Sequence, residues 1–409
     1  MLRCGLLGET LGHSYSPMIH HELGEYDYRL FEVSKEDLDA FLCSDRWDGL
    51  NVTIPYKKAV VPYCAELSEA AERLQSVNTL VRRPDGTLYG DNTDLFGFLY
   101  MVRRSSIDPA GKKALVLGSG GASNTVTAVL AELGAETVVI SRSGENNYGN
   151  LQRHEDAAAI VNATPVGMYP NTGVSPVDLK RFPKLEGVLD VIYNPARTQL
   201  LLDAEALPIP CANGLWMLVA QAKESAEYFT GKSIGDAVIA KIYGTLAAQM
   251  ANIVLIGMPG CGKSTVGALL ADKLGRKLMD ADEEIVRLAG KPIPAIFAED
   301  GETVFRDWET KALSQLGKQS ALVIATGGGC VTQMRNYPLL HQNGTIFWLK
   351  RDISKLPTDG RPLSQVNPLD AMFAKRAPMY AAFADHAVSN DGTAGETVAA
   401  ILSIMEEPI

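Results

Sequence analysis

The sequence predicts an α/β protein of more than one domain. Short apolar runs, which indicate buried strands, alternate with segments whose apolar residues recur at helical spacing. Several of these runs end in glycine or in polar residues, as strands do where they lead into a ligand-binding turn. The length of 409 residues exceeds that of one ordinary domain, so we expect two or three.

The composition, with 46% hydrophobic and 21% charged residues, is that of a globular chain with a full core. The net charge of −10 disfavours a nucleic-acid partner, because phosphate backbones bind to basic surfaces. The six scattered cysteines form no C-x-x-C pair, which favours a reducing cytoplasm and disfavours a zinc site or a disulfide framework. No apolar stretch is long enough to span a membrane, and no secretion signal is evident. We therefore expect a cytoplasmic protein without membrane partners, whose oligomeric state the sequence leaves open.

The most specific motif is the segment Gly257–Thr265, which has the pattern G-x-x-x-x-G-K-[ST]. An apolar run, Ile253–Ile256, precedes it and a helical pattern follows it, which is the context that this phosphate-binding loop requires. Lys263 would reach the outer phosphates, and the Ser264 hydroxyl would ligate Mg²⁺. The alternative, a structural turn with a chance Lys-Ser pair, is disfavoured by both flanks. The residues expected to bind the nucleotide are Gly260, Cys261, Gly262, Lys263, Ser264 and Thr265.

Residues 1–105 carry a second set of polar side chains, placed where predicted strands end. Ligands bind at the carboxyl ends of strands in open α/β sheets. Each residue alone fits ordinary turn chemistry; Ser14 and Ser16, for example, could cap the helix that Pro17 starts. Together they indicate a site for a small polar ligand: Ser14, Ser16, Asn51, Thr53, Lys57, Asn78 and Asp94.

The stretches around these residues, G-H-S-x-S-P, N-V-T-I-P-Y-K, V-N-T and G-D-N-T-D, resemble the substrate domain of shikimate dehydrogenases. The resemblance implies that 3-dehydroshikimate and shikimate are the small-molecule substrates, and that Lys57 and Asp94 are the catalytic pair. A cationic Lys beside a carboxylate can deliver the proton that a carbonyl oxygen needs when hydride reduces it. By the same resemblance the ring acid would be held by Ser14, Ser16, Thr53, Asn78 and Asp94, and Asn51 is also expected to bind it.

A second glycine-rich turn follows the apolar run Lys113–Gly118, before a helix and the predicted strand Thr137–Ser141. This βαβ pattern is typical of dinucleotide-binding domains, where the turn admits the pyrophosphate to a helix N-terminus. NAD-preferring domains carry Asp or Glu at the end of the second strand, whereas this chain has Ser141, Arg142 and Ser143. An Arg between two hydroxyls suits a 2′-phosphate and favours NADP(H); a solvated loop arginine is the alternative. The turn residues expected to bind this cofactor are Gly118, Ser119, Gly120, Gly121 and Ala122.

The resemblance to shikimate dehydrogenases covers residues 1–245 and includes V-N-A-T-P-V-G-M, D-V-I-Y-N-P and N-G-L-W-M-L-V-A-Q. It implies substrate contacts from Tyr193 and Gln221. It also implies cofactor contacts from Thr164, Val191, Gly214 and Met217, although core packing is an alternative for Met217. Only about 17 residues separate Arg142 from the next predicted strand, Ala159–Ala163, so at least one helix of this domain should be missing or reduced.

The segment from about residue 250 onward resembles shikimate kinase along its whole length. The predicted strand Lys277–Asp282 ends in two carboxylates, which period-two alternation would place on one face. The resemblance implies ATP and Mg²⁺ as cofactors, with Asp280 at the metal and Asp282 as the base for the acceptor hydroxyl. Capping of the next helix is the alternative for Asp282.

The same resemblance implies how the kinase substrate would be held. Arg306 and Arg376 would clamp the carboxylate, for which their planar guanidinium groups are suited. A glycine turn after the predicted strand Ala321–Ala325 would line the ring, through Gly327, Gly328 and Gly329. Arg361 would come from a lid and meet the phosphates in the transition state.

Together these features predict a bifunctional enzyme of aromatic amino acid biosynthesis. It would reduce 3-dehydroshikimate with NADPH and phosphorylate shikimate with ATP and Mg²⁺. The expected domains are a substrate-binding domain (1–105, completed by helices at about 214–246), a Rossmann-like NADP-binding domain (106–213) and a nucleoside-monophosphate-kinase-like P-loop domain (250–409). Two alternatives stay open: a quinate/shikimate dehydrogenase that uses NAD, or a non-catalytic shikimate-binding sensor, fused in either case to the kinase.

Overall fold

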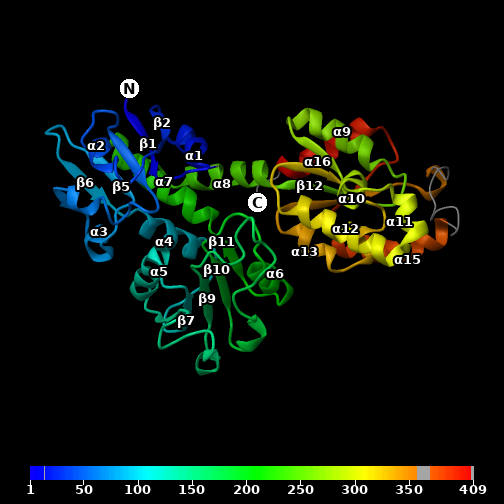
Figure 1. Ribbon diagram of the computed structural model, residues 1–409, viewed down its shortest axis with the longest axis horizontal. Coiled ribbons are helices and arrows are strands. Elements are labelled where there is room, and N and C mark those ends of the chain that lie inside the picture. Colours follow the sequence, from blue (N-terminus) through cyan, green and yellow to red (C-terminus); the bar gives the residue numbers. More distant parts are fainter. Residues whose placement is uncertain (13, 357–368, 407–409) are drawn as a thin grey trace. The chain divides into compact units, whose positions relative to one another are not determined.

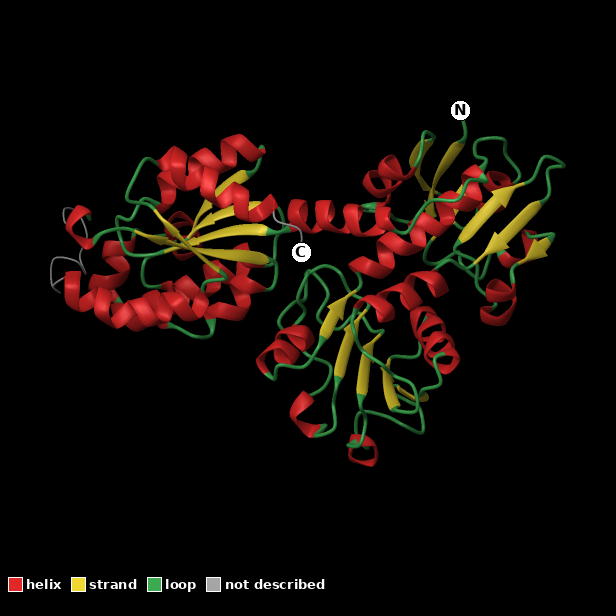
Figure 2. Cartoon of the chain, turned by 180° about the vertical axis from the view of Figure 1, so that it is seen from behind, coloured by secondary structure: helices red, strands yellow, loops and turns green. Residues whose placement is uncertain are grey.

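The computed structural model of the chain describes residues 1–12, 14–356 and 369–406. In this described part the strands form three sheets with helices packed against them, so the predicted α/β fold is confirmed (Figures 1 and 2). The chain divides into two compact units. The first comprises Met1–Val166, Ser175–Tyr193 and Asp203–Thr245; the second comprises Gly167–Val174, Asn194–Leu202 and Leu246–Ile409. The finer division at 1–105, 106–213 and 250–409 stays a prediction.

The first sheet is mixed, with the strand order β2-β1-β3-β5-β6-β4. Its strands are β1 (Arg3–Gly8), β2 (Asp27–Glu32), β3 (Gly49–Val52), β4 (Glu66–Leu67), β5 (Thr79–Arg82) and β6 (Leu88–Asp91). β1 and β3 are parallel, whereas β5 runs antiparallel to β3 with Asn51 opposite Thr79. Because of these directions, the end of β3 and the start of β5 lie at the same edge of the sheet. Polar residues from distant parts of the sequence therefore meet there.

Helices cover this sheet and complete the first unit's substrate half. They are α1 (Ser16–Leu23), α2 (Leu38–Leu42), η1 (Val61–Tyr63), α3 (Glu69–Leu74), α4 (Asp94–Arg104), α7 (Leu215–Thr230) and α8 (Ala237–Met250). Helices α4 and α7 approach so closely that a Cβ at Gly97 would lie 2.7 Å from the carbonyl oxygen of Met217. The proline turn at Pro55 predicts a helix that begins at Lys57, but the structure has none there. Residues 54–60 form turns, because the Lys57 carbonyl accepts a hydrogen bond from the distant Val77 amide at 2.8 Å.

The second sheet is entirely parallel, with the order β11-β10-β9-β7-β8. Its elements are β7 (Lys113–Leu117), α5 (Gly121–Glu132), β8 (Glu136–Ile140), η2 (Leu151–His154), β9 (Ala159–Asn162), η3 (Leu179–Arg181), β10 (Gly187–Asp190), α6 (Gln199–Ala206) and β11 (Cys211–Asn213). All four residues of β9 and of β10 are buried, as in a parallel sheet covered on both faces. Between β8 and β9 there is no α-helix, only η2, which confirms that this domain is reduced.

The third sheet is also parallel, with the order β13-β14-β12-β15-β16. Its strands are β12 (Asn252–Ile256), β13 (Lys277–Asp280), β14 (Leu322–Ala325), β15 (Gly344–Lys350) and β16 (His386–Ser389). The helices of this unit are α9 (Lys263–Leu274), α10 (Ala281–Ala289), α11 (Ile293–Glu299), α12 (Gly301–Gly317), η4 (Cys330–Thr332), α13 (Asn336–His341), η5 (Ile353–Lys355), α15 (Leu369–Phe383) and α16 (Ala394–Glu406). In Figure 1, α9 and α16 lie together on one side of the sheet and α12 and α13 on the other. The fully buried strand β12 therefore delivers the phosphate-binding loop to the carboxyl edge of the sheet.

The strand that was predicted over Lys277–Asp282 ends two residues earlier than expected. Asp280 is the N-cap of α10, and its Oδ1 accepts a hydrogen bond from the Asp282 amide at 2.9 Å. Asp282 is therefore a residue of the first helical turn, where a carboxylate is favoured by the helix dipole. The two carboxylates reach the same site from a strand end and a helix start, rather than from one face of a strand.

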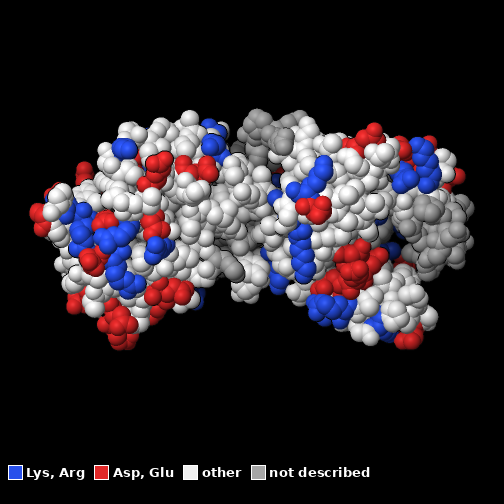
Figure 3. All heavy atoms as spheres, turned by 90° about the horizontal axis from the view of Figure 1, so that it is seen from above, with Lys and Arg blue, Asp and Glu red and all other residues white. Residues whose placement is uncertain are grey.

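The face shown in Figure 3 mixes acidic and basic side chains, in keeping with the overall net charge of −10. Among the described helices, none is both long enough and apolar enough to cross a lipid bilayer.

We predict that the α4–α7 contact tolerates no side chain. Gly97→Ala should lower the free energy of unfolding by about 2 kcal/mol, because the added methyl group forces two backbones apart. Gly244→Ala in α8 is the matched control, since a Cβ at that position would meet no atom within 4 Å. It should be neutral or stabilise by about 0.5 kcal/mol. Urea unfolding of both variants measures the difference, and equal stabilities would contradict the contact.

Candidate active sites

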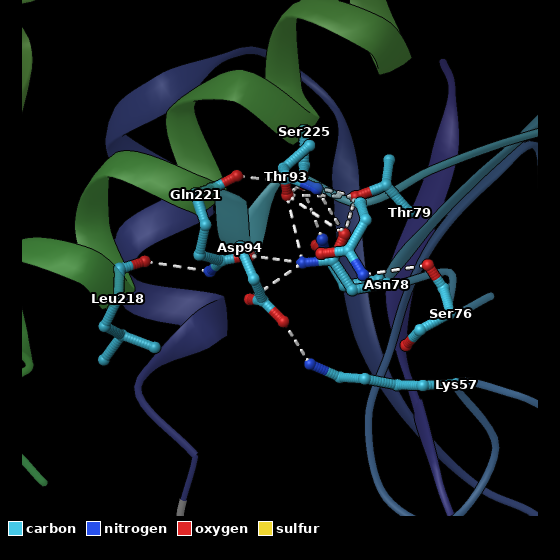
Figure 4. Close-up of polar contacts among 11 residues, drawn as sticks. Lys57, Ser76, Asn78, Thr79, Thr93, Asp94, Leu218, Gln221 and Ser225 are labelled. Atoms are coloured by element: carbon cyan, nitrogen blue, oxygen red, sulfur yellow. Dashed lines mark hydrogen bonds and ion pairs between the residues drawn. The ribbon is translucent and has the colours of Figure 1, made fainter. Parts of the chain in front are cut away.

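An ion pair between Lys57 and Asp94 lies at the shared edge of β3 and β5 (Figure 4). Lys57 Nζ donates to Asp94 Oδ2 at 2.5 Å, and the two side chains are 30% and 17% exposed. Asp94 is the first residue of α4, so the start of this helix positions its carboxylate. The ammonium group is thus held in place yet remains open to a ligand.

The amide of Asn78 fixes the carboxylate from the other side. Its Nδ2 donates to Asp94 Oδ1 at 3.0 Å and to Thr93 Oγ1 at 3.1 Å, and lies 3.4 Å from Gln221 Oε1. Its Oδ1 accepts from the Thr93 amide at 2.8 Å. Four residues predicted to act on the substrate, Lys57, Asn78, Asp94 and Gln221, are therefore brought together, although they come from four separate segments.

The hydroxyl of Ser225 on α7 connects this cluster to the interior, and Ser225 was not among the residues predicted from the sequence. It accepts from Asn51 Nδ2 at 2.8 Å, donates to the Gln221 carbonyl at 2.9 Å, and lies 2.8 Å from Thr79 Oγ1 and 3.0 Å from Thr93 Oγ1. Ser225 is fully buried, so each of these polar groups depends on the others for its hydrogen bonds. Only its spacing of four residues from Gln221 on the same helix could have pointed to it.

The other predicted substrate residues of this half occupy the surrounding loops. Ser14 Oγ accepts from the amide of Ser16, the first residue of α1, at 3.2 Å, so the capping alternative fits Ser14, whereas Ser16 lies within the helix. Asn51 is buried, and its Oδ1 accepts from the Tyr28 hydroxyl at 2.8 Å. Thr53 directly follows β3. Tyr193 lies edge-on to the neighbouring ring of Tyr15, with 6.1 Å between centroids. Their contacts with substrate stay predictions.

A cavity of about 710 Å³ opens at the carboxyl edge of β7 and β8. Gly118 has φ +105°, and a Cβ there would lie 2.8 Å from Thr164 Cγ2, so only glycine fits this turn. Space beside Gly120 and Gly121 is open, which leaves the first amides of α5 free for an anion such as a dinucleotide pyrophosphate. These features fit NADP(H). Of the predicted cofactor residues, those lining the cavity are Gly118, Ser119, Gly120, Ser141, Arg142 and Thr164.

The remaining predicted cofactor residues lie outside the cavity lining. Gly121 and Ala122 begin α5, and Ser143 is exposed on the loop after β8. A Cβ at Gly214 would lie 2.0 Å from the Val191 carbonyl oxygen, so these two backbones are in close contact. Met217 packs against the hydrophobic core, as its alternative interpretation required. A cofactor contact from any of these residues stays a prediction.

The phosphate-binding loop of the second unit bends through three glycines with positive φ: Gly257, Gly260 and Gly262. Lys263 is buried and donates from Nζ to the carbonyls of Gly257 at 2.9 Å and Met258 at 3.1 Å. Ser264 Oγ donates to Asp280 Oδ2 at 3.1 Å. A hydroxyl and one carboxylate beside a phosphate loop are oxygen ligands of the kind that Mg²⁺ takes, together with nucleotide phosphates. The residues therefore fit Mg²⁺ and ATP.

A second ion pair, between Arg306 and Glu309 of α12, faces the glycine turn after β14. Arg306 Nη1 contacts Glu309 Oε2 at 2.9 Å, with side chains that are 7% and 1% exposed. Burial lowers the pKa of Arg306, but its neighbouring carboxylates Glu309 and Glu302 raise it by more. Burial raises the pKa of Glu309 despite the opposing charge of Arg306. For the Glu309 carboxyl, burial thus has the larger effect on the pKa. For the Arg306 guanidinium, the attraction of the carboxylates has the larger effect, so this group stays charged.

The glycine turn lets functional side chains press against the backbone. A Cβ at Gly329 would lie 2.4 Å from Arg306 Nη1, and one at Gly327 would lie 3.0 Å from both Asp282 Oδ1 and Glu309 Oε1. Arg376 Nη1 donates to the Gly328 carbonyl at 3.1 Å. Asp282, Arg306 and Arg376 are thus gathered around this turn. Arg361 lies outside the described residues, and the predicted nucleotide residue Cys261 is fully buried.

These groups surround a cavity of about 870 Å³. Its lining includes the cations of Arg306 and Arg376, the phosphate-binding loop, and the carboxylates of Asp280 and Asp282. Glu309 also lines it, and its buried Oε1 has no hydrogen-bond partner among the described residues. Sequence reasoning missed Glu309; its position three residues after Arg306 on a helix was the available signal.

Comparison with known proteins agrees with both sites. Residues 6–80 match the family model "Shikimate dehydrogenase substrate binding domain", and residues 259–406 match "Shikimate kinase". The chain is 35% identical over 267 residues to a shikimate dehydrogenase (NADP(+)) of Clostridium perfringens, covering 60% of this chain and 98% of that relative. Among solved structures, shikimate dehydrogenase 1 of Peptoclostridium difficile is 38% identical, with a TM-score of 0.55 over 60% of this chain and 98% of that one.

A further similar structure is that of Thermus thermophilus shikimate 5-dehydrogenase in complex with NADP(H) and shikimate. It is 30% identical, with a TM-score of 0.55, and the match covers 59% of this chain and 98% of that one. Nearly the full length of each of these relatives is therefore represented in the chain. The chain belongs to the shikimate dehydrogenase family and carries, fused to that part, a shikimate kinase domain.

Proposed function

We propose that the chain is a bifunctional enzyme of the shikimate pathway. It reduces 3-dehydroshikimate to shikimate with NADPH, and it phosphorylates shikimate with ATP and Mg²⁺ to shikimate 3-phosphate. The observation that carries this conclusion is the presence of two sets of groups in one chain. The first unit holds the Lys57–Asp94 ion pair and a cavity at a glycine turn, and the second holds a cavity that the phosphate-binding loop, Asp282 and Arg306 line together. The product of the first reaction is the substrate of the second.

The ion pair of the first site supplies the acid–base chemistry of reduction. Bound NADPH supplies the hydride. The carbonyl oxygen of the substrate then gains negative charge, which the Lys57 ammonium stabilises and neutralises by giving up a proton. Asp94, held by Asn78, keeps Lys57 oriented before the transfer. Tyr193 and the serines at 14 and 16 are proposed to hold the acid.

The second site is arranged for phosphoryl transfer. Asp282 would accept the proton of the attacking hydroxyl, and Arg306 and Arg376 would hold the substrate carboxylate beside the glycine turn. Lys263 and the loop amides would hold the phosphates, with Mg²⁺ at Ser264 and Asp280. Positioning and charge neutralisation provide most of the catalysis in such sites.

The alternatives are not favoured. The relative from Clostridium perfringens is named as NADP(+)-dependent, and Arg142 lines the cavity instead of an acidic residue. The intact Lys57–Asp94 pair gives no support to a non-catalytic sensor. A cytoplasmic location, supported by six free cysteines, and the absence of nucleic-acid and membrane partners stay proposals.

A coupled assay tests the proposed function. The purified chain receives 3-dehydroshikimate, NADPH, ATP and Mg²⁺, and mass spectrometry follows the products. We expect shikimate 3-phosphate to form, and shikimate to accumulate when ATP is omitted. Consumption of NADPH without the phosphorylated product, or no consumption at all, would refute the bifunctional assignment.

Lys57→Ala should lower kcat of the dehydrogenase about 1,000-fold, because it removes the proton donor. Kinase turnover in the same preparation should be unchanged. Lys58→Ala, at the exposed neighbouring position, is the matched control and should retain both activities. A dehydrogenase rate within threefold of the parent would exclude Lys57 as the acid.

Asp282→Asn should lower kcat of the kinase at least 100-fold, because the amide cannot accept the hydroxyl proton. Dehydrogenase turnover should stay the same. The control is Glu283→Gln, which changes the exposed carboxylate next to it on α10. If both variants lose the same activity, Asp282 has no specific part in proton transfer.

Chelation separates the two reactions. Excess EDTA should abolish kinase activity and leave dehydrogenase activity intact, because only the second site requires a metal ion. Added Mg²⁺ should restore the kinase rate fully. Loss of NADPH oxidation on chelation would show that the first site also depends on a metal, contrary to the proposal.

A further inference from the structure

The edge of the second sheet lacks the helix that a complete dinucleotide-binding half would carry. Strand β8 is the outermost strand, and residues 141–150 form a loop after it. In such folds the second strand ends beside the adenosine ribose, and the adenine lies beyond it. The wall of any adenine pocket here must therefore come from this loop.

Asparagine side chains give the loop a defined shape. The Ser141 amide donates to the Asn146 carbonyl at 3.1 Å, which closes the loop at its base. The Asn147 amide donates to Asn150 Oδ1 at 2.8 Å, and Asn150 Nδ2 donates to the Glu145 carbonyl at 2.8 Å. Loops that are tied by side-chain hydrogen bonds of this kind hold a fixed backbone. The backbone at Tyr148, between Asn147 and Asn150, is thus held in one position.

The Tyr148 side chain lines the 710 Å³ cavity together with Arg142 and the glycine turn. It is partly buried, and burial raises the pKa of its hydroxyl while the charge of Arg142 opposes the shift. The ring therefore lies within electrostatic reach of the guanidinium group. Within the described chain, no hydrogen bond fixes the Tyr148 hydroxyl. The aromatic ring is therefore the part of Tyr148 that can contact a ligand in the cavity.

We propose that the ring of Tyr148 stacks on the adenine of NADP(H), beside Arg142 at the 2′-phosphate. This inference rests on the proposed function and assigns the adenosine subsite of the first reaction. An aromatic face can stack on any base, and stacking on one ring is enough to secure it where no helix closes the pocket. The loop thus replaces, with one aromatic contact, the wall that the missing helix would have provided.

The test uses the full chain and adenosine 2′,5′-bisphosphate, which carries the adenosine half of NADP alone. Isothermal titration gives its dissociation constant. Tyr148→Phe keeps the ring and should bind within twofold of the parent, whereas Tyr148→Leu keeps apolar bulk without a π-face and should bind about 10-fold more weakly. Tyr63→Leu, at another partly buried tyrosine on η1, should bind normally. Kinase turnover of each sample serves as an internal control of folding.

A fluorescent variant gives a second, independent readout. In Tyr148→Trp, adenosine 2′,5′-bisphosphate should quench the new indole emission in a saturable way, beyond any quenching in the parent. Parent-like affinity of Tyr148→Leu, or Tyr148→Trp emission that does not respond to a bound ligand, would overturn the stacking and leave the proposed function standing. If the parent chain binds neither NADPH nor the bisphosphate, both the stacking and the NADPH-dependent reduction are wrong.

Discussion

Each of the two sites depends on an ion pair in which a sheltered carboxylate holds a cation in place. In the first site Asp94 holds Lys57, and in the second Glu309 holds Arg306. Neighbouring groups bind both carboxylates: the Asn78 amide donates to Asp94, and the Arg306 guanidinium contacts Glu309, although burial raises the pKa of that carboxyl. Removing either member would leave the other as an uncompensated charge, which is far more costly than losing the pair. This is why the cations keep fixed positions before any ligand binds.

The hydrogen-bond network behind Asp94 extends this rigidity into the protein. Ser225 links α7 to Asn51 on β3 and to the strand and helix starts at Thr79 and Thr93. An unsatisfied buried polar group costs about 1–3 kcal/mol, so the network is stable only when every member has its hydrogen-bond partner. Groups that are fixed in advance need no reorganisation when charge develops on the substrate. The close contact of Gly97 with Met217 brings α4 and α7 near enough for these bonds to form.

Much of this arrangement could be predicted from the sequence, because the informative signals were local. The phosphate-binding loop and the turn at Gly118 depend on neighbouring residues, and both were found with the correct flanking elements. Ser225 and Glu309 were missed because their importance comes from partners on other elements or from burial, neither of which a local pattern encodes. The strand predicted to reach Asp282 was too long, because the capping side chain of Asp280 starts the helix earlier than hydrophobic alternation indicates.

The proposed function requires one chain to hold two separate sites for the same ring acid. Calorimetric titration of shikimate into the chain counts these sites. A non-hydrolysable ATP analogue is present, and NADP⁺ is left out because the first site would use it to oxidise shikimate. We expect two shikimate-binding sites per chain. Asp94→Ala should abolish binding at one of them, and Arg306→Ala should abolish binding at the other. A stoichiometry of one site in the parent chain, or loss of both sites through either substitution, would contradict it.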